Sequence, residues 1–331
     1  MKNFNKTRIA PTPSGFLHLG NILSFALTAA LARKTGASIL LRIDDLDRKR
    51  VQELYIQDIF DTLRFMGIPW DEGPADAAEF EREYSQLHRM ELYSRALEQL
   101  RSAGAVFACS CSRAEIGQAP KPEGRRRSLG GASAAGIYPG TCRNRGLPLE
   151  TAGVSWRLRQ PDFGQSYCPP GQPAANGPAG QPGFAPALSV KMIDGVRVDA
   201  VLPPEMQDFV VMKKDGFPAY QLTSVVDDIH YGVDLIVRGN DLWPSTLAQH
   251  CLSYSLGAAG FRETAFYHHT LLLGDDGAKL SKSSGDTSIR YLRQSGLGPA
   301  EIYSLILRKL GVEGEVGDWE ELGVMLGPAL L

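Results

Sequence analysis

No stretch of the chain approaches the roughly 20 consecutive apolar residues that a membrane-spanning helix needs. Residues 1–6 are polar and lack the apolar core of a secretory signal peptide. A large charge of either sign is also missing, because the formal net charge is −2. Cysteine is scarce, and its odd number, five, argues against the disulfide framework of a secreted protein. These absences predict a soluble cytoplasmic protein in which any nucleic acid is bound by a local charged patch.

What the chain does contain, near its start, is the pattern strand, loop, helix, strand. A short apolar run at residues 8–10 predicts the end of a strand, and residues 38–43 predict a second one. Between them, residues 22–34 are apolar and predict a buried helix, with Asn21 near its N-cap and Gly36 as its stop. This order opens a Rossmann-like, doubly wound parallel sheet of the α/β class. A chain of 331 residues, 43% of them hydrophobic, can hold one large domain with an insertion.

The loop between strand and helix reads PTPSGFLHLGN. A loop in this place directs backbone N–H groups and the positive end of a helix at an anion, so it can hold a phosphate. Gly15 and Gly20 have the spacing of a P-loop, but Asn21-Ile22 stand where a P-loop has Lys-Ser/Thr. A ring N–H of His18 could donate to a phosphate instead. The alternative is that His18 is an ordinary loop histidine.

A second segment near the end of the chain could supply the missing charge. It reads KLSKS, with Lys279 and Lys282 among small hydroxyl residues, and follows the turn-forming run GDDG. Two lysines on a loop can neutralise a polyphosphate. The alternative is a solvated surface loop.

Together, HLGN and KLSKS resemble the paired "HIGH" and "KMSKS" motifs of the class I aminoacyl-tRNA synthetases. The resemblance implies an ATP- and Mg²⁺-dependent ligase. It implies catalytic roles for His18, Lys279 and Lys282. It implies that ATP is bound by His18, Gly20, Asn21 and Lys282.

The run LRIDDLDR after the second strand resembles the "LRIEDTD" segment of the glutamyl branch of this family. In that branch the first acidic residue receives the α-amino group of the substrate, and here that residue is Asp44. The residues alone equally allow a solvated acidic turn. Because the glutamyl enzymes have Glu at this position and the glutaminyl enzymes have Asp, the choice between glutamate and glutamine stays open.

Two further segments resemble the amino-acid pocket of the same branch. RIAPT resembles "RFAPS", which implies that Arg8 pairs with the side-chain carboxylate of the substrate, as a guanidinium fork suits. The span from Tyr220, which we expect at a strand end, to Arg238 resembles "YxLAxVVDD…VxRGxDL". The full set of glutamate-binding residues implied by the resemblance is Arg8, Ile9, Ala10, Pro11, Thr12, Asp44, Tyr220 and Arg238.

Cys109, Cys111 and Cys142 form an incomplete zinc pattern. Zinc favours four soft or borderline ligands, and no histidine lies between Cys111 and Cys142 to complete the set. The pattern resembles that of the glutamyl-queuosine tRNA(Asp) synthetases, which implies that Tyr138 is the fourth ligand of one Zn²⁺. The alternative is three reduced, buried thiols without a metal.

The middle of the chain predicts a domain inserted into the sheet. Residues 53–67 and 84–104 predict packing helices, with Leu54 and Leu87 among their apolar positions. Residues 160–186, rich in Pro, Gly and Gln, predict a disordered excursion. The expected divisions are 1–100, the first half of the nucleotide-binding domain; 101–204, the inserted domain; 205–270, the second half of the nucleotide-binding domain; and 271–331, the lysine segment and a short helical end.

Residues 283–331 leave no room for the large anticodon-binding part of ordinary glutamyl-tRNA synthetases, and they contain one clear helix, 299–310. This favours the glutamyl-queuosine branch. The expected reaction is activation of L-glutamate with ATP and its transfer to the queuosine base in the anticodon of tRNA(Asp), by a monomer. Two alternatives remain: a shortened glutamyl-tRNA synthetase that charges the 3′ end, and an inactive synthetase-like binding protein.

Overall fold

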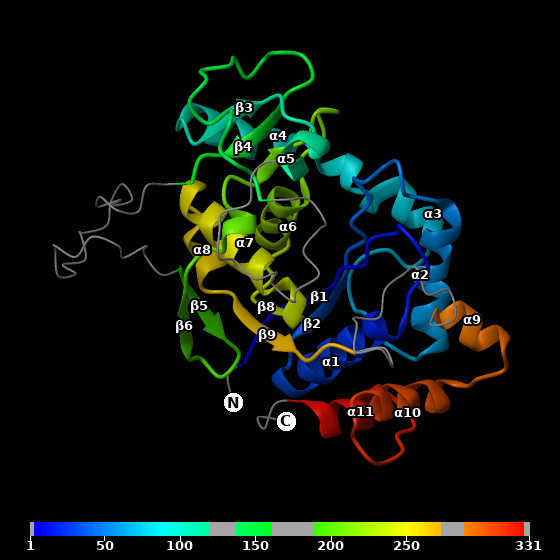
Figure 1. The fold of residues 1–331 in the computed structure, drawn as a ribbon. Coiled ribbons are helices and arrows are strands. Elements are labelled where there is room, and N and C mark those ends of the chain that lie inside the picture. Colours follow the sequence, from blue (N-terminus) through cyan, green and yellow to red (C-terminus); the bar gives the residue numbers. More distant parts are fainter. Residues whose placement is uncertain (1–2, 119–136, 161–187, 273–287, 328–331) are drawn as a thin grey trace. The chain divides into compact units, whose positions relative to one another are not determined.

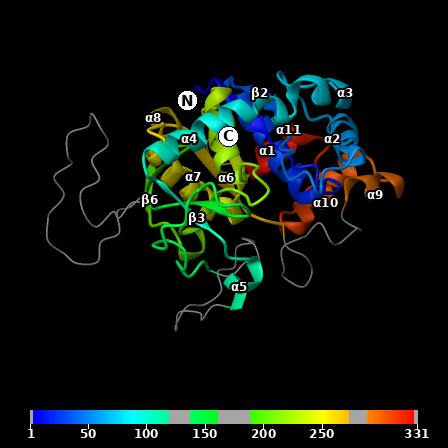
Figure 2. The same ribbon diagram turned by 90° about the horizontal axis from the view of Figure 1, so that it is seen from above.

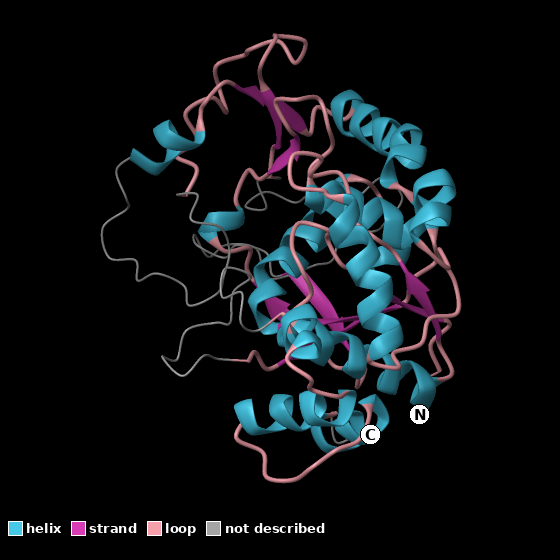
Figure 3. Ribbon diagram, turned by 90° about the vertical axis from the view of Figure 1, so that its right-hand side faces the viewer, coloured by secondary structure: helices cyan, strands magenta, loops and turns pink. Residues whose placement is uncertain are grey.

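The computed structural model describes residues 3–118, 137–160, 188–272 and 288–327, and the text below concerns these ranges (Figure 1). Lys279, Lys282 and the predicted excursion at 161–186 lie outside them. The chain groups into two units. The first consists of Met1–Met90, Gly232–Asn240 and Ala265–Leu331, and the second of Glu91–Tyr231 and Asp241–Thr264. Figure 3 shows that helices make up most of the regular structure and that the strands are short.

The first unit contains two parallel strand pairs. β1 pairs with β2, and β8 pairs with β9. β8 runs alongside β1 in the same direction, because the Asp234 N–H donates to the Lys6 carbonyl and Arg8 Nη1 donates to the Val237 carbonyl. The spatial order is therefore β2, β1, β8, β9, the parallel arrangement that the sequence predicted. The bounds are β1 Lys6–Ile9, β2 Ser38–Leu41, β8 Leu235–Gly239 and β9 Ala265–His269.

Helix α1, Leu19–Thr35, connects β1 to β2 and is buried along most of its length. Gly36 ends it with φ 77°, as predicted. The N-cap is His18, and Asn21, which was expected near the N-cap, is the third residue of the helix. The two side chains cap the helix reciprocally: His18 Nδ1 accepts the Gly20 N–H at 3.1 Å, and Asn21 Oδ1 accepts the His18 N–H at 3.1 Å. The helix therefore starts directly after the histidine.

Helix α2, Glu53–Phe65, confirms the helix predicted there. Its buried face carries apolar side chains and one carboxylate, Asp58. Leu54 is 47% exposed and Leu87 is 40% exposed, so neither packs in the core as the spacing suggested. The described residues that follow α2 form α3, Ala77–Glu79, a π-helix at Phe80–Tyr84 and a 3₁₀-helix at Gln86–Arg89.

The C-terminal part of the first unit has three helices where the sequence predicted one. They are α9 (Ile289–Gln294), α10 (Pro299–Lys309) and α11 (Trp319–Leu326). Figures 1 and 2 show α11 alongside α1. The two helices approach so closely that a Cβ on Gly323 would lie 2.2 Å from the Ala30 Cβ. A glycine is therefore required at this crossing.

The second unit contains the remaining strands. β3, β4 and β7 form an antiparallel sheet in this order, and β5 and β6 form a hairpin that turns at Gly195, φ 86°. The bounds are β3 Val106–Cys109, β4 Ser155–Leu158, β5 Leu188–Met192, β6 Arg197–Ala200 and β7 Val210–Met212.

The helices of the second unit are α4 (Met90–Ser102), α5 (Arg113–Gln118), α6 (Tyr220–His230), α7 (Trp243–Ser255) and α8 (Ala259–Arg262). Tyr220 is the first residue of α6, so the prediction that it ends a strand is wrong. Ala219 is extended, at φ −91° and ψ 158°, and the helix begins directly after it. Seven of the eleven α6 residues are buried, and five of those seven are polar, so the segment shows no apolar period that would predict a helix.

Within the described ranges, no helix has the length and the apolar character needed to cross a bilayer.

Candidate functional site

The turn between β1 and α1 has a defined hydrogen-bonding pattern around His18. Because Nδ1 accepts the Gly20 N–H, the neutral ring carries its proton on Nε2, which can then donate to an anion. The ring also stands at the N-terminus of a 17-residue helix, where backbone N–H groups favour negative charge. The turn therefore presents donors of the kind that a phosphate accepts from, and phosphate binding there stays a prediction.

The chain that follows the KLSKS segment returns to this same turn. The Ile289 N–H donates to the Leu17 carbonyl at 2.8 Å, and Ser288 pairs with His18 in an isolated antiparallel bridge. The described part of the chain therefore resumes, after the KLSKS segment, beside His18.

Asp44 lies beside the RIAPT segment, at the carboxyl ends of β1 and β2. Its backbone N–H donates to the Pro11 carbonyl at 2.9 Å, and the Arg42 N–H donates to the Ile9 carbonyl at 2.9 Å. The buried Asp44 carboxylate is held in a bidentate pair: Arg42 Nε lies 2.8 Å from Oδ1 and Nη2 lies 3.1 Å from Oδ2. A carboxylate oxygen can accept more than one hydrogen bond, so an ion-paired carboxylate can also bind an ammonium group.

The neighbouring Asp45 has a different role. It is fully buried, and it accepts hydrogen bonds from Ser85 Oγ at 2.6 Å, the Gln86 N–H at 2.8 Å and Arg48 Nη1 at 2.8 Å. These contacts attach the end of β2 to residues 85–86. Of the two adjacent carboxylates, Asp44 is therefore the better candidate for substrate binding.

Two buried arginines lie on neighbouring parallel strands, each one residue before the end of its strand. Arg8, on β1, is 6% exposed and donates to the Val237 carbonyl at 3.4 Å. Arg238, on β8, is 3% exposed, with its guanidinium 5.5 Å from the centre of the Phe266 ring. The carboxyl ends of parallel strands are where such sheets bind ligands, and a guanidinium is suited to a carboxylate. Tyr220 belongs to the second unit and is 42% exposed.

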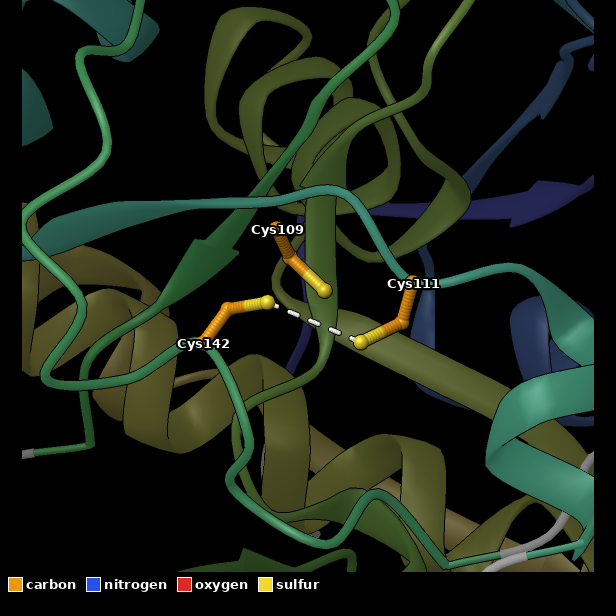
Figure 4. Close-up of side chains that lie close together, drawn as sticks. All are labelled: Cys109, Cys111 and Cys142. Atoms are coloured by element: carbon orange, nitrogen blue, oxygen red, sulfur yellow. Dashed lines mark hydrogen bonds between the residues drawn. The ribbon is translucent and has the colours of Figure 1, made fainter.

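Cys109, Cys111 and Cys142 form a cluster in the second unit (Figure 4). Their sulfurs all lie within 4.8 Å of one another, and the Cys111 and Cys142 sulfurs are 3.6 Å apart. All three are free thiols. The hydroxyl of Tyr138 belongs to the same cluster, because it accepts the Cys142 N–H at 2.8 Å and is hydrogen-bonded to Cys109.

This donor set fits a zinc ion. With Zn–S bonds of about 2.3 Å, tetrahedral geometry places ligand sulfurs about 3.8 Å apart, close to the separation of Cys111 and Cys142. Cys109 and Cys142 are buried, and Phe107 packs against them. The ring of Tyr138 stacks on Phe107, with 6.2 Å between the ring centres. The structure thus assembles the four residues that the resemblance implied.

The ionisable side chains of the cluster differ in pKa. Burial and the neighbouring thiols raise the pKa of Cys111 to about 12. Burial opposes ionisation of Cys142 as well, but hydrogen bonds from Ser110 and Cys111 outweigh it and lower the pKa to about 7. Burial also raises the pKa of Tyr138. A bound cation would favour the ionised form of these groups.

Sequence reasoning missed Arg42, which pairs with Asp44, and Asp58, which contacts the turn before His18. Arg42 carried a usable signal: it lies two residues before Asp44 on an extended segment, so both side chains share a face. Asp58, which accepts the Leu17 N–H at 3.2 Å, carried only a weak one, a carboxylate at a helical position with apolar neighbours.

The chain matches the family model described as "tRNA synthetases class I (E and Q), catalytic domain" over residues 5–131 and 185–318. It is 35% identical to the Glutamyl-Q tRNA(Asp) synthetase of Nitratidesulfovibrio vulgaris, over 92% of this chain and 86% of that protein. It is 37% identical to the protein of the same name from Symbiobacterium thermophilum, over 89% and 83%.

Glutamate–tRNA ligases are also similar. The one from Anaeromyxobacter sp. is 32% identical over 92% of this chain, which spans 57% of that ligase. Among solved structures, the Glutamate-tRNA Synthetase of Elizabethkingia anophelis superposes with a TM-score of 0.64 at 22% identity, over 92% of this chain and 61% of that one, and so shares the fold. The parallel sheet, the turn with His18 at its helix start and the matched family model agree: the chain belongs to the class I tRNA synthetases of the E and Q type.

Proposed function

We propose that this chain activates L-glutamate with ATP and transfers it to the queuosine base in the anticodon of tRNA(Asp). The observation that carries the activation step is the contact of Ser288 and Ile289 with the His18 turn, because it brings the chain after the second motif to the first. The choice of acceptor is supported by the two relatives named Glutamyl-Q tRNA(Asp) synthetase, which match over most of both chains.

In the activation step, a carboxylate oxygen of the amino acid attacks the α-phosphorus of ATP. A bond forms between them, the bond from the α-phosphorus to the bridging oxygen breaks, and pyrophosphate leaves. The attacking carboxylate is already ionised and needs no base. Catalysis can therefore consist of positioning and of stabilising the phosphate charge.

Class I synthetases use ATP with Mg²⁺, which offsets phosphate charge when bound. From this chain, we assign the phosphate contacts to His18 Nε2, to the backbone at Gly20 and Asn21, and to the ammonium groups of Lys279 and Lys282. Lys282 should act mainly in the transition state, so that it affects turnover more than ATP affinity.

For the amino acid, we assign Arg8 and Arg238 to carboxylate recognition and Asp44 to the α-amino group. The fixed Arg42–Asp44 pair supports this, because it orients the carboxylate before substrate binds. The remaining pocket residues of the proposal are Ile9, Ala10, Pro11, Thr12 and Tyr220.

For the metal, we assign Cys109, Cys111, Tyr138 and Cys142 as the ligands of one structural Zn²⁺. The ion would join the end of β3 to the chain at 138–142 and so stabilise the inserted domain that we place at 101–204. The supporting observation is that the four side chains already lie together.

ATP–pyrophosphate exchange tests the activation step. We expect exchange with glutamate in the absence of RNA, and assays with glutamine in parallel decide the specificity at Asp44. A folded protein with Mg²⁺ that shows no exchange under any RNA condition would refute the activity and leave the inactive binding protein as the better hypothesis.

The acceptor requires a separate experiment, because similarity to the glutamate–tRNA ligases keeps charging of the 3′ end as a second candidate. Labelled glutamate is transferred to tRNA(Asp) that contains queuosine, and the nuclease fragments are mapped. Label in the anticodon fragment supports the proposal, and label on the terminal adenosine supports the ligase. Periodate treatment alone does not separate them, since it destroys both the queuosine diol and the terminal ribose.

A further inference from the structure

Asp58 on α2 is a buried carboxylate that the reaction described above does not use. Its side chain belongs to the buried face of the helix, and the residue is 2% exposed. Oδ2 accepts the Leu17 N–H at 3.2 Å, whereas Oδ1 is buried and has no hydrogen-bond partner in the described part of the chain. A buried carboxylate with an unpaired oxygen disfavours folding. Groups of this kind are found at functional sites more often than in ordinary cores.

The charges around Asp58 only partly offset this cost. Burial raises the pKa of Asp58 above its usual 3.8, and Asp61 on the same helix raises it further. The Leu17 N–H and the guanidinium groups of Arg290 and Arg293 on α9 act in the opposite direction but do not cancel the effect of burial. The carboxylate is therefore less stable here than in the unfolded chain.

Both backbone polar groups of Leu17, the N–H and the carbonyl, form hydrogen bonds. Asp58 accepts its N–H, and the Ile289 N–H donates to its carbonyl at 2.8 Å. Its side chain is 1% exposed. The next residue is His18, the N-cap of α1, so a rotation of the backbone at Leu17 would redirect the imidazole.

The neighbouring Phe16 is held by the same two elements. Its ring meets the ring of Tyr55, on α2, edge-on at 5.0 Å, and the guanidinium of Arg290, on α9, lies 5.0 Å from its centre. Helices α2 and α9 thus contact consecutive residues of the turn. Of these contacts, only that of Asp58 involves an acidic group.

We propose that Asp58 is a positioning residue for ATP activation: through Leu17 it fixes the backbone that presents His18 to the nucleotide. The inference rests on the proposed function. An ionised acceptor forms a stronger hydrogen bond than a neutral amide, which explains why a carboxylate stands where an asparagine would bury more easily.

The proposal predicts that stability and activity change in opposite directions in Asp58→Asn. Because the pKa is raised, the folded chain binds a proton more readily than the unfolded chain, and ionised Asp58 destabilises the fold above that pKa. The neutral variant should therefore melt no lower than the wild type at neutral pH. Its advantage should shrink as the pH falls from the raised pKa toward 3.8, where the wild-type group becomes protonated.

The kinetic test measures kcat and KM for ATP in pyrophosphate exchange. We expect kcat to fall about 10-fold in Asp58→Asn and further in Asp58→Leu, with KM for ATP within about 2-fold, since small misplacements cost up to about 100-fold. Asp61→Asn is the matched control: it makes the same change on the same helix, where Oδ1 accepts from Gln57 at 2.8 Å, and it should leave kcat unchanged.

Amide hydrogen exchange at Leu17 supplies a readout that does not depend on activity. It should quicken in Asp58→Leu, or in Asp58→Asn if the leucine variant does not fold. Wild-type kcat in Asp58→Asn, or a loss of kcat proportional to a loss of folded protein, would overturn the inference. If the wild type shows no pyrophosphate exchange, the proposed function fails. Independently of that result, equal hydrogen-exchange protection of Leu17 in the wild type and in the Asp58 variant would show that Asp58 does not hold the turn.

Discussion

The His18 turn and the cysteine cluster are two small polar sites that the chain organises in different ways. The turn is held by two hydrogen bonds to residues far from it in the sequence: Asp58 accepts the Leu17 N–H, and the Ile289 N–H donates to the Leu17 carbonyl. The cluster draws its three sulfurs from residues 109–142, in one stretch of one unit. Protein contacts alone complete the turn, whereas several thiols within 4.8 Å of one another favour a cation.

This difference predicts how stability and turnover respond when a side chain of each site is lost. The turn is backed by its own packing, so losing a side chain there should lower turnover more than stability. In the proposed zinc site the metal would hold the cluster together, so losing a ligand should lower stability more than amino-acid activation. The predictions below would sharpen or break this contrast, from the largest expected effect to the smallest.

Lys282→Ala should have the largest effect. The variant should fold as the wild type does and lose most activity, about 100-fold or more in kcat for pyrophosphate exchange, because the turn itself has no lysine to offset phosphate charge. Steady-state kinetics and a melting curve measure both quantities. Lys309→Ala, at the end of α10, is the control. Unchanged turnover would show that the lysine segment is not part of the site.

His18→Asn separates helix capping from catalysis. Asparagine is a good N-cap and keeps an acceptor for the Gly20 N–H, but it lacks the imidazole donor. We expect kcat to fall by about 100-fold with little change in melting temperature. The exposed His88→Asn is the matched control. Wild-type turnover in His18→Asn would show that His18 only caps the helix and that the turn does not differ from the cluster in its effect on turnover.

Cys142→Ala should act on the other site. Elemental analysis should find about one zinc per wild-type chain and less than about a tenth in the variant, whose melting temperature should fall because the metal no longer stabilises the fold. Glutamate-dependent exchange should persist in the fraction that remains folded. Cys251→Ala, a buried thiol on α7 outside the cluster, should keep its zinc. A wild type without zinc would mean reduced, buried thiols.

Glu72→Gln should have the smallest effect and sets a baseline for a polar contact away from both sites. Glu72 accepts from Lys6 Nζ at 2.7 Å and from Ser38 Oγ at 2.9 Å, and chiefly the Lys6 contact lowers its pKa below 4.5. A lowered pKa adds stability above 4.5 that is lost as the pH falls through the folded-state value. The variant should lose about 0.2–1 kcal/mol at neutral pH and little in acid, measured by denaturant titration. Altered zinc content or turnover would contradict the separation of the two sites.

The local elements were largely predictable. Residues 8–43 carry apolar runs separated by a Gly/Pro-rich loop, and the hairpin at Gly195 follows from its turn residues. The prediction of Tyr220 at a strand end is wrong because the apolar residues that follow it form too short a run to show a helical period, whereas five of the seven buried residues of α6 are polar. The capping role of His18 was missed because histidine is not a preferred N-cap residue.

The sequence by itself determined the identity and order of the chemical groups: the imidazole in a turn before a helix, the two lysines, the arginines at strand ends and the three thiols. These follow from residue types and short spacings, which local physics constrains. Only the tertiary structure decided that Asp58 and Ile289 hold Leu17, that Arg42 fixes Asp44 while Asp45 serves the fold, and that Tyr138 reaches the sulfurs. Most of these contacts join segments that are distant in the chain. Their proximity in space results from packing, which no local sequence pattern encodes.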